Sequence, residues 1–272
     1  MRTLDPAFSA HLATGATTLA TCWRIVRTDG ATLGFTDHDE AISFDGTAFA
    51  PASGLDGGEA AKKLGPQVDT SEIAGILASA AISEEDIELG RYDNATVETW
   101  RVNWRDVSVR DLRARATIGE ITREDGLYRA ELRSGQAALN IVKGRIYQAL
   151  CDAELGDARC GVNLADPAFA AASTVAQVRD RYRIEVTGLE GFAEGWFGFG
   201  RLAWSSGKRI GLADRIVNHQ RIGGTDILGF GEPVGDWVVP GDAATATAGC
   251  DRRFATCRAK FANALNFRGF PH

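Results

Sequence analysis

The sequence predicts a mainly β protein of the α+β class, built from two domains. Runs of β-branched and aromatic residues recur along the chain, and several are separated by Asp-Gly dipeptides, which are strong hairpin-turn signals. Helical periodicity is confined to a few segments. With 272 residues, the chain is long enough for two domains with their own cores.

The first half of the chain reads as a series of hairpins. The turn dipeptides are Asp29-Gly30, Asp45-Gly46 and Asp125-Gly126. The strands expected on either side of them span residues 17–27 and 31–36, 42–44 and 47–49, and 113–123 and 127–133. Residues 95–104 alternate like a half-buried strand, and the Gly-, Ala- and Lys-rich residues 55–65 are typical of a loop.

Three helices are expected. Ser83 followed by three acidic residues is a helix start, and that helix should end near Gly90. The strongest helical pattern covers residues 134–149, and a last helix covers residues 251–265. Their apolar positions are Leu139, Val142, Ile146 and Leu150 in the first, and Phe254, Phe261 and Leu265 in the second.

The second half alternates strands with turns. The predicted strands lie within residues 172–187 (a pair), 195–205, 209–221 and 225–229. We place the domain boundary at the end of the helix predicted over residues 134–149. This gives a β-rich N-terminal domain at 1–149 and a C-terminal domain at 150–272 with strands, a terminal helix and most of the cysteines.

Composition narrows the class of protein. The net charge is −6 and no basic tract stands out, which argues against a dedicated nucleic-acid binder. No apolar run is long enough to span a bilayer, so no membrane insertion is expected. The N-terminus lacks the apolar core of a signal peptide, so we expect folding in a reducing cytoplasm, where disulfides are disfavoured.

Four of the five cysteines form two pairs, C-x8-C and C-x6-C. The pairs are Cys151 with Cys160, and Cys250 with Cys257. An iron–sulfur cluster or a zinc ion bound by four thiolates, two local disulfides, or four separate buried thiols could each account for them. Zinc ribbons usually use C-x-x-C knuckles, so the wider spacing favours a cluster. A link across residues 160–250 closes a loop worth about 4–5 kcal/mol in the loop-entropy model.

Other candidate chemistry is weaker. The polar run Thr36-Asp37-His38-Asp39-Glu40 could bind a metal or act in acid–base catalysis, but a solvated turn is the favoured interpretation. The glycines between 195 and 200 resemble a twisted strand, and no phosphate loop, G-x-S-x-G or H-E-x-x-H motif occurs. A redox or hydrolytic enzyme using the same cysteines is disfavoured, because four thiolates leave no open coordination position. We therefore expect a protein that is not an enzyme.

Three stretches carry a family resemblance. They are residues 34–39 (Gly-Phe-Thr-Asp-His-Asp), residues 89–93 with 100–104, and the closing residues 249–271. With them the chain resembles, over nearly its whole length, the BR0599-type phage-tail family of prophages and gene transfer agents. Within that family it is similar to the baseplate hub proteins of Rhodobacter-type gene transfer agents.

The resemblance implies a structural hub and a cofactor. Such hubs are similar to the lambda-type tail-tip protein, which carries an iron–sulfur cluster on two cysteine pairs. Carried over to this chain, the ligands of a [4Fe-4S] cluster are Cys151, Cys160, Cys250 and Cys257. Zinc remains the alternative. Cys22 matches no ligand and is expected to be a buried strand residue.

The resemblance also implies partners and a location. The hub is expected to be a ring on the tail axis, most simply a homotrimer. It would lie between the distal tail protein ring and a large receptor-directed tip protein, with tape-measure protein or DNA in its lumen. Its location would be the tail baseplate of a virion assembled in the bacterial cytoplasm.

Overall fold

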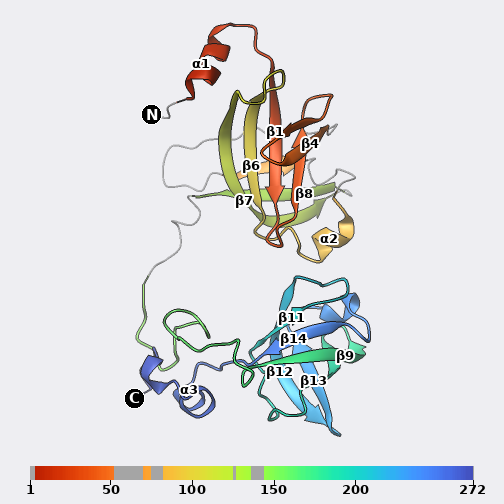
Figure 1. Ribbon diagram of the computed structural model, residues 1–272. Coiled ribbons are helices and arrows are strands. Elements are labelled where there is room, and N and C mark those ends of the chain that lie inside the picture. The colour runs from red at the N-terminus through yellow and green to blue at the C-terminus, as the bar shows by residue number, and fades with distance from the viewer. Residues whose placement is uncertain (1–3, 52–69, 75–81, 125–126, 136–143, 272) are drawn as a thin grey trace. The chain divides into compact units, whose positions relative to one another are not determined.

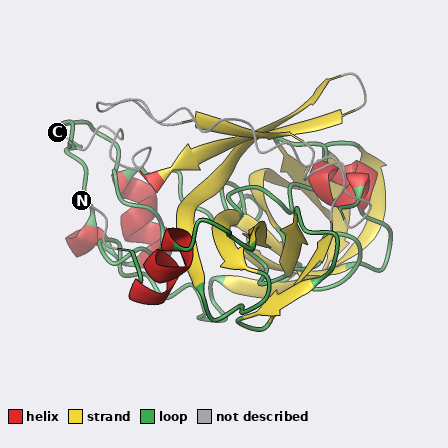
Figure 2. Ribbon diagram, turned by 90° about the horizontal axis from the view of Figure 1, so that it is seen from above, coloured by secondary structure: helices red, strands yellow, loops and turns green. Residues whose placement is uncertain are grey.

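The computed structural model describes the chain except for residues 1–3, 52–69, 75–81, 125–126, 136–143 and 272 (Figure 1). The chain divides into two compact units, Met1–Val142 and Lys143–His272. The predicted boundary at residue 149 lies a few residues beyond this division. Strands are the main regular structure of both units and the helices are short (Figure 2), as the predicted mainly β class requires.

The first unit contains one large sheet. Its eight strands follow the order β3-β4-β2-β1-β6-β7-β8-β5, with β2 and β4 parallel and the other neighbouring pairs antiparallel. The elements are α1 (Pro6–Ala13), β1 (Leu19–Val26), β2 (Thr32–Thr36), β3 (Ile42–Phe44), β4 (Thr47–Pro51), β5 (Thr70–Ala74), α2 (Glu84–Glu88), β6 (Thr96–Asn103), β7 (Arg110–Glu124) and β8 (Leu127–Ser134).

The expected local signals form this sheet. Asp45 and Gly46 both have positive φ, at 48° and 71°, which is the type I′ geometry that matches strand twist in a two-residue hairpin. The Ser83 side chain accepts a hydrogen bond from the Asp86 N–H at 3.1 Å and caps α2 as predicted. The hairpin predicted at Asp125-Gly126 joins β7 and β8, although its two turn residues and the loop predicted at 55–65 lie outside the described residues.

The sheet of the first unit packs on both faces. One core cluster includes Trp23, Ile25, Phe35, Tyr92, Val97 and Ile118, and the other includes Ala20, Cys22, Ile42, Phe44, Phe49 and Val102. Apolar residues at odd and at even positions of β1 are therefore buried, because successive side chains of a strand point to opposite faces of the sheet. This is why residues 17–27 do not show the strict alternation of a half-buried strand.

The second unit is built on a closed barrel with the strand order β10-β13-β12-β11-β14-β9. Closure comes from the antiparallel pairing of β14 with β9, in which Thr247 faces Ala170. Closure leaves no unpaired edge strand in the barrel. The elements are β9 (Ala170–Asp180), β10 (Arg183–Thr187), β11 (Arg201–Trp204), β12 (Ala213–Ile222), β13 (Thr225–Phe230), the 3₁₀-helix η3 (Val234–Trp237), β14 (Ala243–Thr247), α3 (Phe254–Phe261) and the 3₁₀-helix η4 (Ala264–Asn266).

The barrel encloses an apolar core and one buried polar network. The core includes Ile184, Leu189, Phe197, Leu202, Ile216 and Leu228. Beside it, the Asp226 carboxylate, 1% exposed, lies 2.9 Å from His219 Nε2 and accepts from Arg221 Nε at 2.8 Å. A buried charge needs such partners, so the network is satisfied.

Three predicted elements differ from the structure: the helix over residues 134–149, the strand over 195–205 and the helix over 251–265. The helix expected over residues 134–149 is absent from its described end, where residues 144–148 have no regular structure and Ile146 is 80% exposed. In place of helical packing, Tyr147 lies against Phe270, with ring centroids 4.6 Å apart, and the Gln148 carbonyl accepts from the Phe270 N–H. A helix this short depends on tertiary packing, so the contact with the C-terminal segment decides its conformation. The strand expected over 195–205 is confined to β11, and residues 194–199 form turns in which Phe199 has a φ of 63°.

The last helix is shorter than predicted. It ends at Phe261 because Ala262 takes a left-handed conformation, with a φ of 48°. Leu265, expected on the same apolar face as Phe254 and Phe261, is 97% exposed. Because α3 ends early, the chain turns back and brings Asn263 to Cys160.

Candidate metal centre

The pairing of β9 with β14, which closes the barrel, brings the two cysteine pairs together. Cys160 precedes β9 and Cys250 follows β14, and these two strands pair along their length. Beyond the pairing, the Ala248 N–H donates to the Phe169 carbonyl at 2.7 Å, which extends the contact toward the cysteines. Strands distant in sequence thus deliver both pairs to one end of the barrel.

Cys151 is held against the C-terminal segment. Its N–H donates to the Arg252 carbonyl at 2.8 Å, and its Sγ accepts from the Arg268 N–H at 3.4 Å. Next to it, the Phe270 N–H donates to the Gln148 carbonyl at 2.8 Å. The segment before Cys151 therefore runs along the last residues of the chain by backbone bonding.

Cys160 closes a turn built by Asp157. The Asp157 Oδ1 accepts from the Cys160 N–H at 2.6 Å, and this hydrogen bond is the largest cause of the lowered pKa of that carboxyl. The side-chain amide of Asn263 donates to the Cys160 carbonyl at 2.7 Å and to its Sγ at 3.6 Å. The turn and Asn263 together fix where this sulfur points.

Cys250 and Cys257 lie on either side of the start of α3. The Arg252 N–H, at a residue with a φ of 63°, donates to Cys250 Sγ at 3.3 Å. Cys257 is on α3, and its thiol donates to the Asn263 carbonyl at 3.3 Å. Burial raises the pKa of Cys250, and it raises the pKa of Cys257 to about 11, with the neighbouring cysteines adding to both shifts.

Lys260 fastens α3 to the barrel. Its Nζ donates to the Gly249 carbonyl at 2.8 Å and to the Trp196 carbonyl, and it lies 4.6 Å from the centroid of a Trp196 ring. Burial lowers the pKa of Lys260 to about 8, while charge on Cys250 opposes that shift. This residue carried no signal in the sequence, because a lysine near a helix C-terminus is ordinary.

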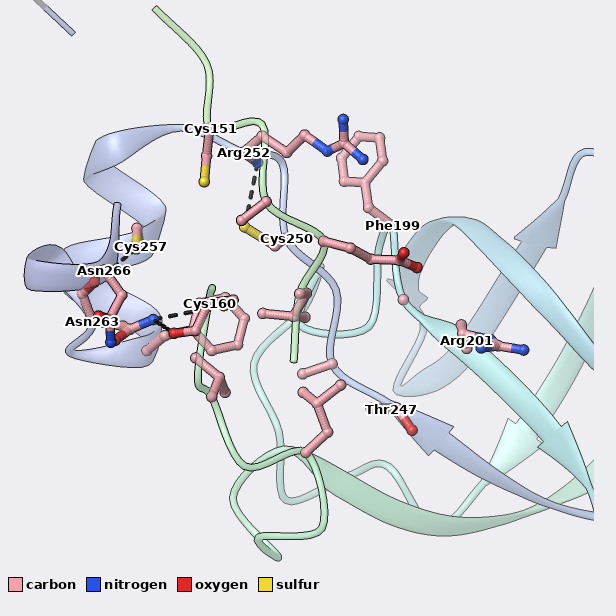
Figure 3. A pocket seen from close by; sticks show the side chains of 18 of the residues that line it. Cys151, Cys160, Phe199, Arg201, Thr247, Cys250, Arg252, Cys257, Asn263 and Asn266 are labelled. Carbon is pink, nitrogen blue, oxygen red and sulfur yellow. Dashed lines mark hydrogen bonds between the residues drawn. The ribbon is translucent and has the colours of Figure 1, made fainter. Parts of the chain in front are cut away.

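The four cysteines line one cavity of about 370 Å³ (Figure 3). Apolar walls come from Leu155, Leu164, Phe199, Phe261 and Phe267, and the cavity is also lined by Glu154, Arg201, Arg215 and Arg252. Across the part of the chain that the structure describes, no group of three or more His, Cys, Asp or Glu side chains is placed to hold a metal ion.

The other candidates lie elsewhere. Cys22 is a fully buried strand residue on β1, as expected, with its thiol 3.6 Å from Thr36 Oγ1. The polar run forms a local turn, in which the Glu40 N–H donates to His38 Nδ1 at 3.0 Å and the His38 N–H donates to Thr36 Oγ1 at 3.2 Å. This agrees with the solvated-turn interpretation of those residues.

Comparison with known proteins matches both halves of the chain. Residues 5–163 match the family described as "Baseplate hub protein, N-terminal attachment domain", and residues 195–272 match "Phage conserved hypothetical protein BR0599". A search of curated proteins finds no match. Within the described residues, no helix is long and apolar enough to cross a membrane.

A solved structure is similar over nearly the whole chain. A chain in the structure titled "Virion of native gene transfer agent (GTA) particle" is 40% identical, with a TM-score of 0.91. The match covers 98% of this chain and 92% of that one. From the family match over more than half of its length, together with this likeness, the chain belongs to the family of phage-type baseplate hub proteins, which are structural components of the virion tail.

Proposed function

We propose that this chain is a structural hub of a phage-like tail baseplate whose C-terminal domain, residues 150–272, is stapled by a [4Fe-4S] cluster. The ligands are Cys151, Cys160, Cys250 and Cys257. The observation that carries this proposal is that four cysteines from two distant segments line one cavity. Four-thiolate ligation is the usual way in which proteins hold such clusters.

The hydrogen bonds around the sulfurs support a thiolate set. N–H groups point at three of the four sulfurs, from Arg268 to Cys151, from Arg252 to Cys250 and from Asn263 to Cys160. A neutral thiol is a weak acceptor, whereas a thiolate is stabilised by such donors. Hydrogen bonds to sulfur are also among the features that set the potential of an iron–sulfur cluster.

The size of the space favours a cluster over a single ion. With a Zn–S distance of about 2.3 Å, the sulfurs of a zinc tetrahedron lie only ~3.8 Å apart. A cavity of about 370 Å³ whose walls include the four cysteines has room for a body of several atoms. A zinc-stapled adaptor is the alternative outcome of the metal assay. A redox enzyme is disfavoured, because four protein thiolates leave no position for a substrate.

The deciding experiment is an assay of metal and sulfide on full-length protein purified without oxygen. About four iron atoms and four sulfides per chain, with a brown colour, are expected for one cluster. Colourless protein holding one zinc ion would overturn the proposed cluster.

The Cys250→Ser variant should lose iron, destabilise the cysteine-bearing part of its domain and block tail assembly. A normal yield of particles from that variant would show that the cysteine site is not needed for tail assembly.

In the tail, the hub forms a ring of three copies on the axis. It joins the distal tail protein ring to a large receptor-directed tip protein, with tape-measure protein or DNA in the lumen. Similarity to a chain of a gene transfer agent virion supports this position. The net charge of −6 suits a passage that does not grip DNA. A cryo-EM map of assembled tails tests it: a different copy number, or a lumen lined with Lys and Arg of this chain, would contradict it.

A further inference from the structure

Asn263 touches both cysteine pairs. Its side-chain amide reaches the Cys160 carbonyl at 2.7 Å and the Cys160 Sγ at 3.6 Å. Its backbone N–H donates to the Cys257 carbonyl at 3.1 Å, a bond that holds whether the Cys257 sulfur is a thiol or a thiolate. Figure 3 shows Asn263 between α3 and the segment that carries Cys160. One residue therefore bridges ligands that are distant in sequence.

The local fold holds Asn263 in this position. The left-handed Ala262 ends α3 and directs the next residue away from the helix axis, toward Cys160. The side-chain amide is then oriented from its other end, because Asn266 Nδ2 donates to Asn263 Oδ1 at 2.7 Å. With the oxygen fixed as an acceptor, the NH₂ group is left to face Cys160.

We infer that Asn263 is a positioning residue for the cluster. It sets Cys160 against Cys257 and places an N–H donor on the Cys160 sulfur. This inference rests on the proposed cluster. An N–H donor withdraws negative charge from a thiolate ligand, so it stabilises the reduced cluster, which carries one more negative charge, and raises the reduction potential.

Asn263 differs in kind from the other two donors. Arg252 and Arg268 donate to sulfur through their backbone N–H groups, which a side-chain substitution leaves in place. Among the hydrogen bonds to cysteine sulfur in the described part of the chain, the bond from Asn263 to Cys160 is the one made by a side-chain amide. A single substitution can therefore remove it while all four ligands stay.

The test compares Asn263→Asp and Asn263→Leu with the parent protein, each as the full chain purified without oxygen. The Asp variant keeps the shape of the side chain but replaces the donor with an acceptor, whereas the Leu variant removes all polarity. The measurements are iron per chain, the midpoint potential from a redox titration followed by EPR, and the rate of bleaching in air. Asn163→Leu is the matched control, because Asn163 is exposed and its side chain caps the Ala165 N–H at 3.1 Å.

Both variants should have a more negative midpoint and faster bleaching than the parent, and the control should match the parent. If either variant fails to fold, the other still gives the midpoint, and loss of iron in both with the fold retained also supports the positioning role. Parent-like iron content and midpoint in the variants would overturn the inference and leave the cluster intact. A parent protein without iron overturns the proposed cluster and, with it, the inference.

Discussion

Gly249 lies directly against the carbonyl oxygen of Gly198. A Cβ on Gly249 would lie 2.0 Å from that oxygen and 2.2 Å from the Gly200 nitrogen, so both obstacles are backbone atoms. The segment leaving β14 thus reaches Cys250 only because residue 249 has no side chain.

The Gly249→Ala substitution should therefore displace Cys250. Overpacking against backbone costs about 1–3 kcal/mol. We expect a lower midpoint of denaturant unfolding for the second unit and less than the parent's iron per chain. Gly191→Ala is the control, because a Cβ there meets nothing within 4 Å. Parent-like iron in the Gly249 variant would mean that the loop at 195–200 can move aside.

Asp226→Ala should be among the most damaging single changes in the barrel. It would leave the Arg221 guanidinium and the buried His219 without their carboxylate. Removing one partner of a buried ion pair costs about 3–5 kcal/mol. The measurement is the free energy of unfolding of the second unit in urea.

The exposed pair between Arg181 and Asp236 supplies the control for Asp226. Their nitrogen and oxygen lie 2.8 Å apart, but the side chains are 64% and 38% exposed. Asp236→Ala should cost no more than about 1 kcal/mol, since solvent screens such pairs. Equal losses in the two variants would show that burial does not govern the barrel network.

Sequence patterns predicted the strands beside the turn dipeptides well, but they missed β5 and β14 and predicted the helices poorly. The Asp-Gly turns and the Ser83 cap act through local backbone chemistry, so they could be read from neighbouring residues. The end of α3 depends on a left-handed alanine at 262, which has no sequence signal. Residues 146 and 150 keep helical spacing, but a pattern does not say whether a packing partner exists.

The cysteine pairs could be found from spacing, but their surroundings could not. The gathering of Cys160 and Cys250 follows from the β9–β14 pairing, which is a long-range contact. Asn263 and Lys260 act through a carbonyl, a sulfur and a ring that only the folded chain brings near them. Asn and Lys residues near a helix end are common, so nothing marked these two.

Cys22 should resist alkylation in the folded protein. Its side chain is fully buried, and burial raises the pKa of its thiol to about 11, so almost none is thiolate at pH 8. With iron bound, iodoacetamide should label no cysteine. After anaerobic removal of iron it should label the part-exposed Cys151 and Cys250 faster than the buried Cys160 and Cys257, and Cys22 should react only in denaturant. Mass spectrometry reads the sites, and native labelling of Cys22 would contradict this.

Glu98→Ala should destabilise the first unit. The Glu98 carboxylate accepts from Arg24 Nη1 at 3.3 Å and from Trp100 Nε1 at 3.2 Å. Without it, Arg24 would keep its contacts with the rings of Phe44 and Phe49 and its distant pairing with Asp45 at 3.8 Å, but it would lose the buried carboxylate that binds it most closely. We expect a loss of about 2–3 kcal/mol in the free energy of unfolding of this unit.

The control for Glu98 is Glu131→Ala, which removes an exposed pair with Arg133. It should change the stability of the first unit by less than about 1 kcal/mol. Iron content should stay at the parent value in both variants, because neither residue belongs to the second unit. A loss of iron in the Glu98 variant would reveal coupling between the units.

The pairing of β9 with β14 changes what a metal contributes to this chain. A link across residues 160–250 is worth about 4–5 kcal/mol when the loop between them is otherwise free. Here the closed barrel already holds the ends of that loop together. The two cysteine pairs are therefore brought near each other before any metal binds. The barrel should therefore fold before the cluster arrives and remain folded after it leaves. Under the proposed assignment, the newly made hub is a folded acceptor that receives the cluster in a late maturation step.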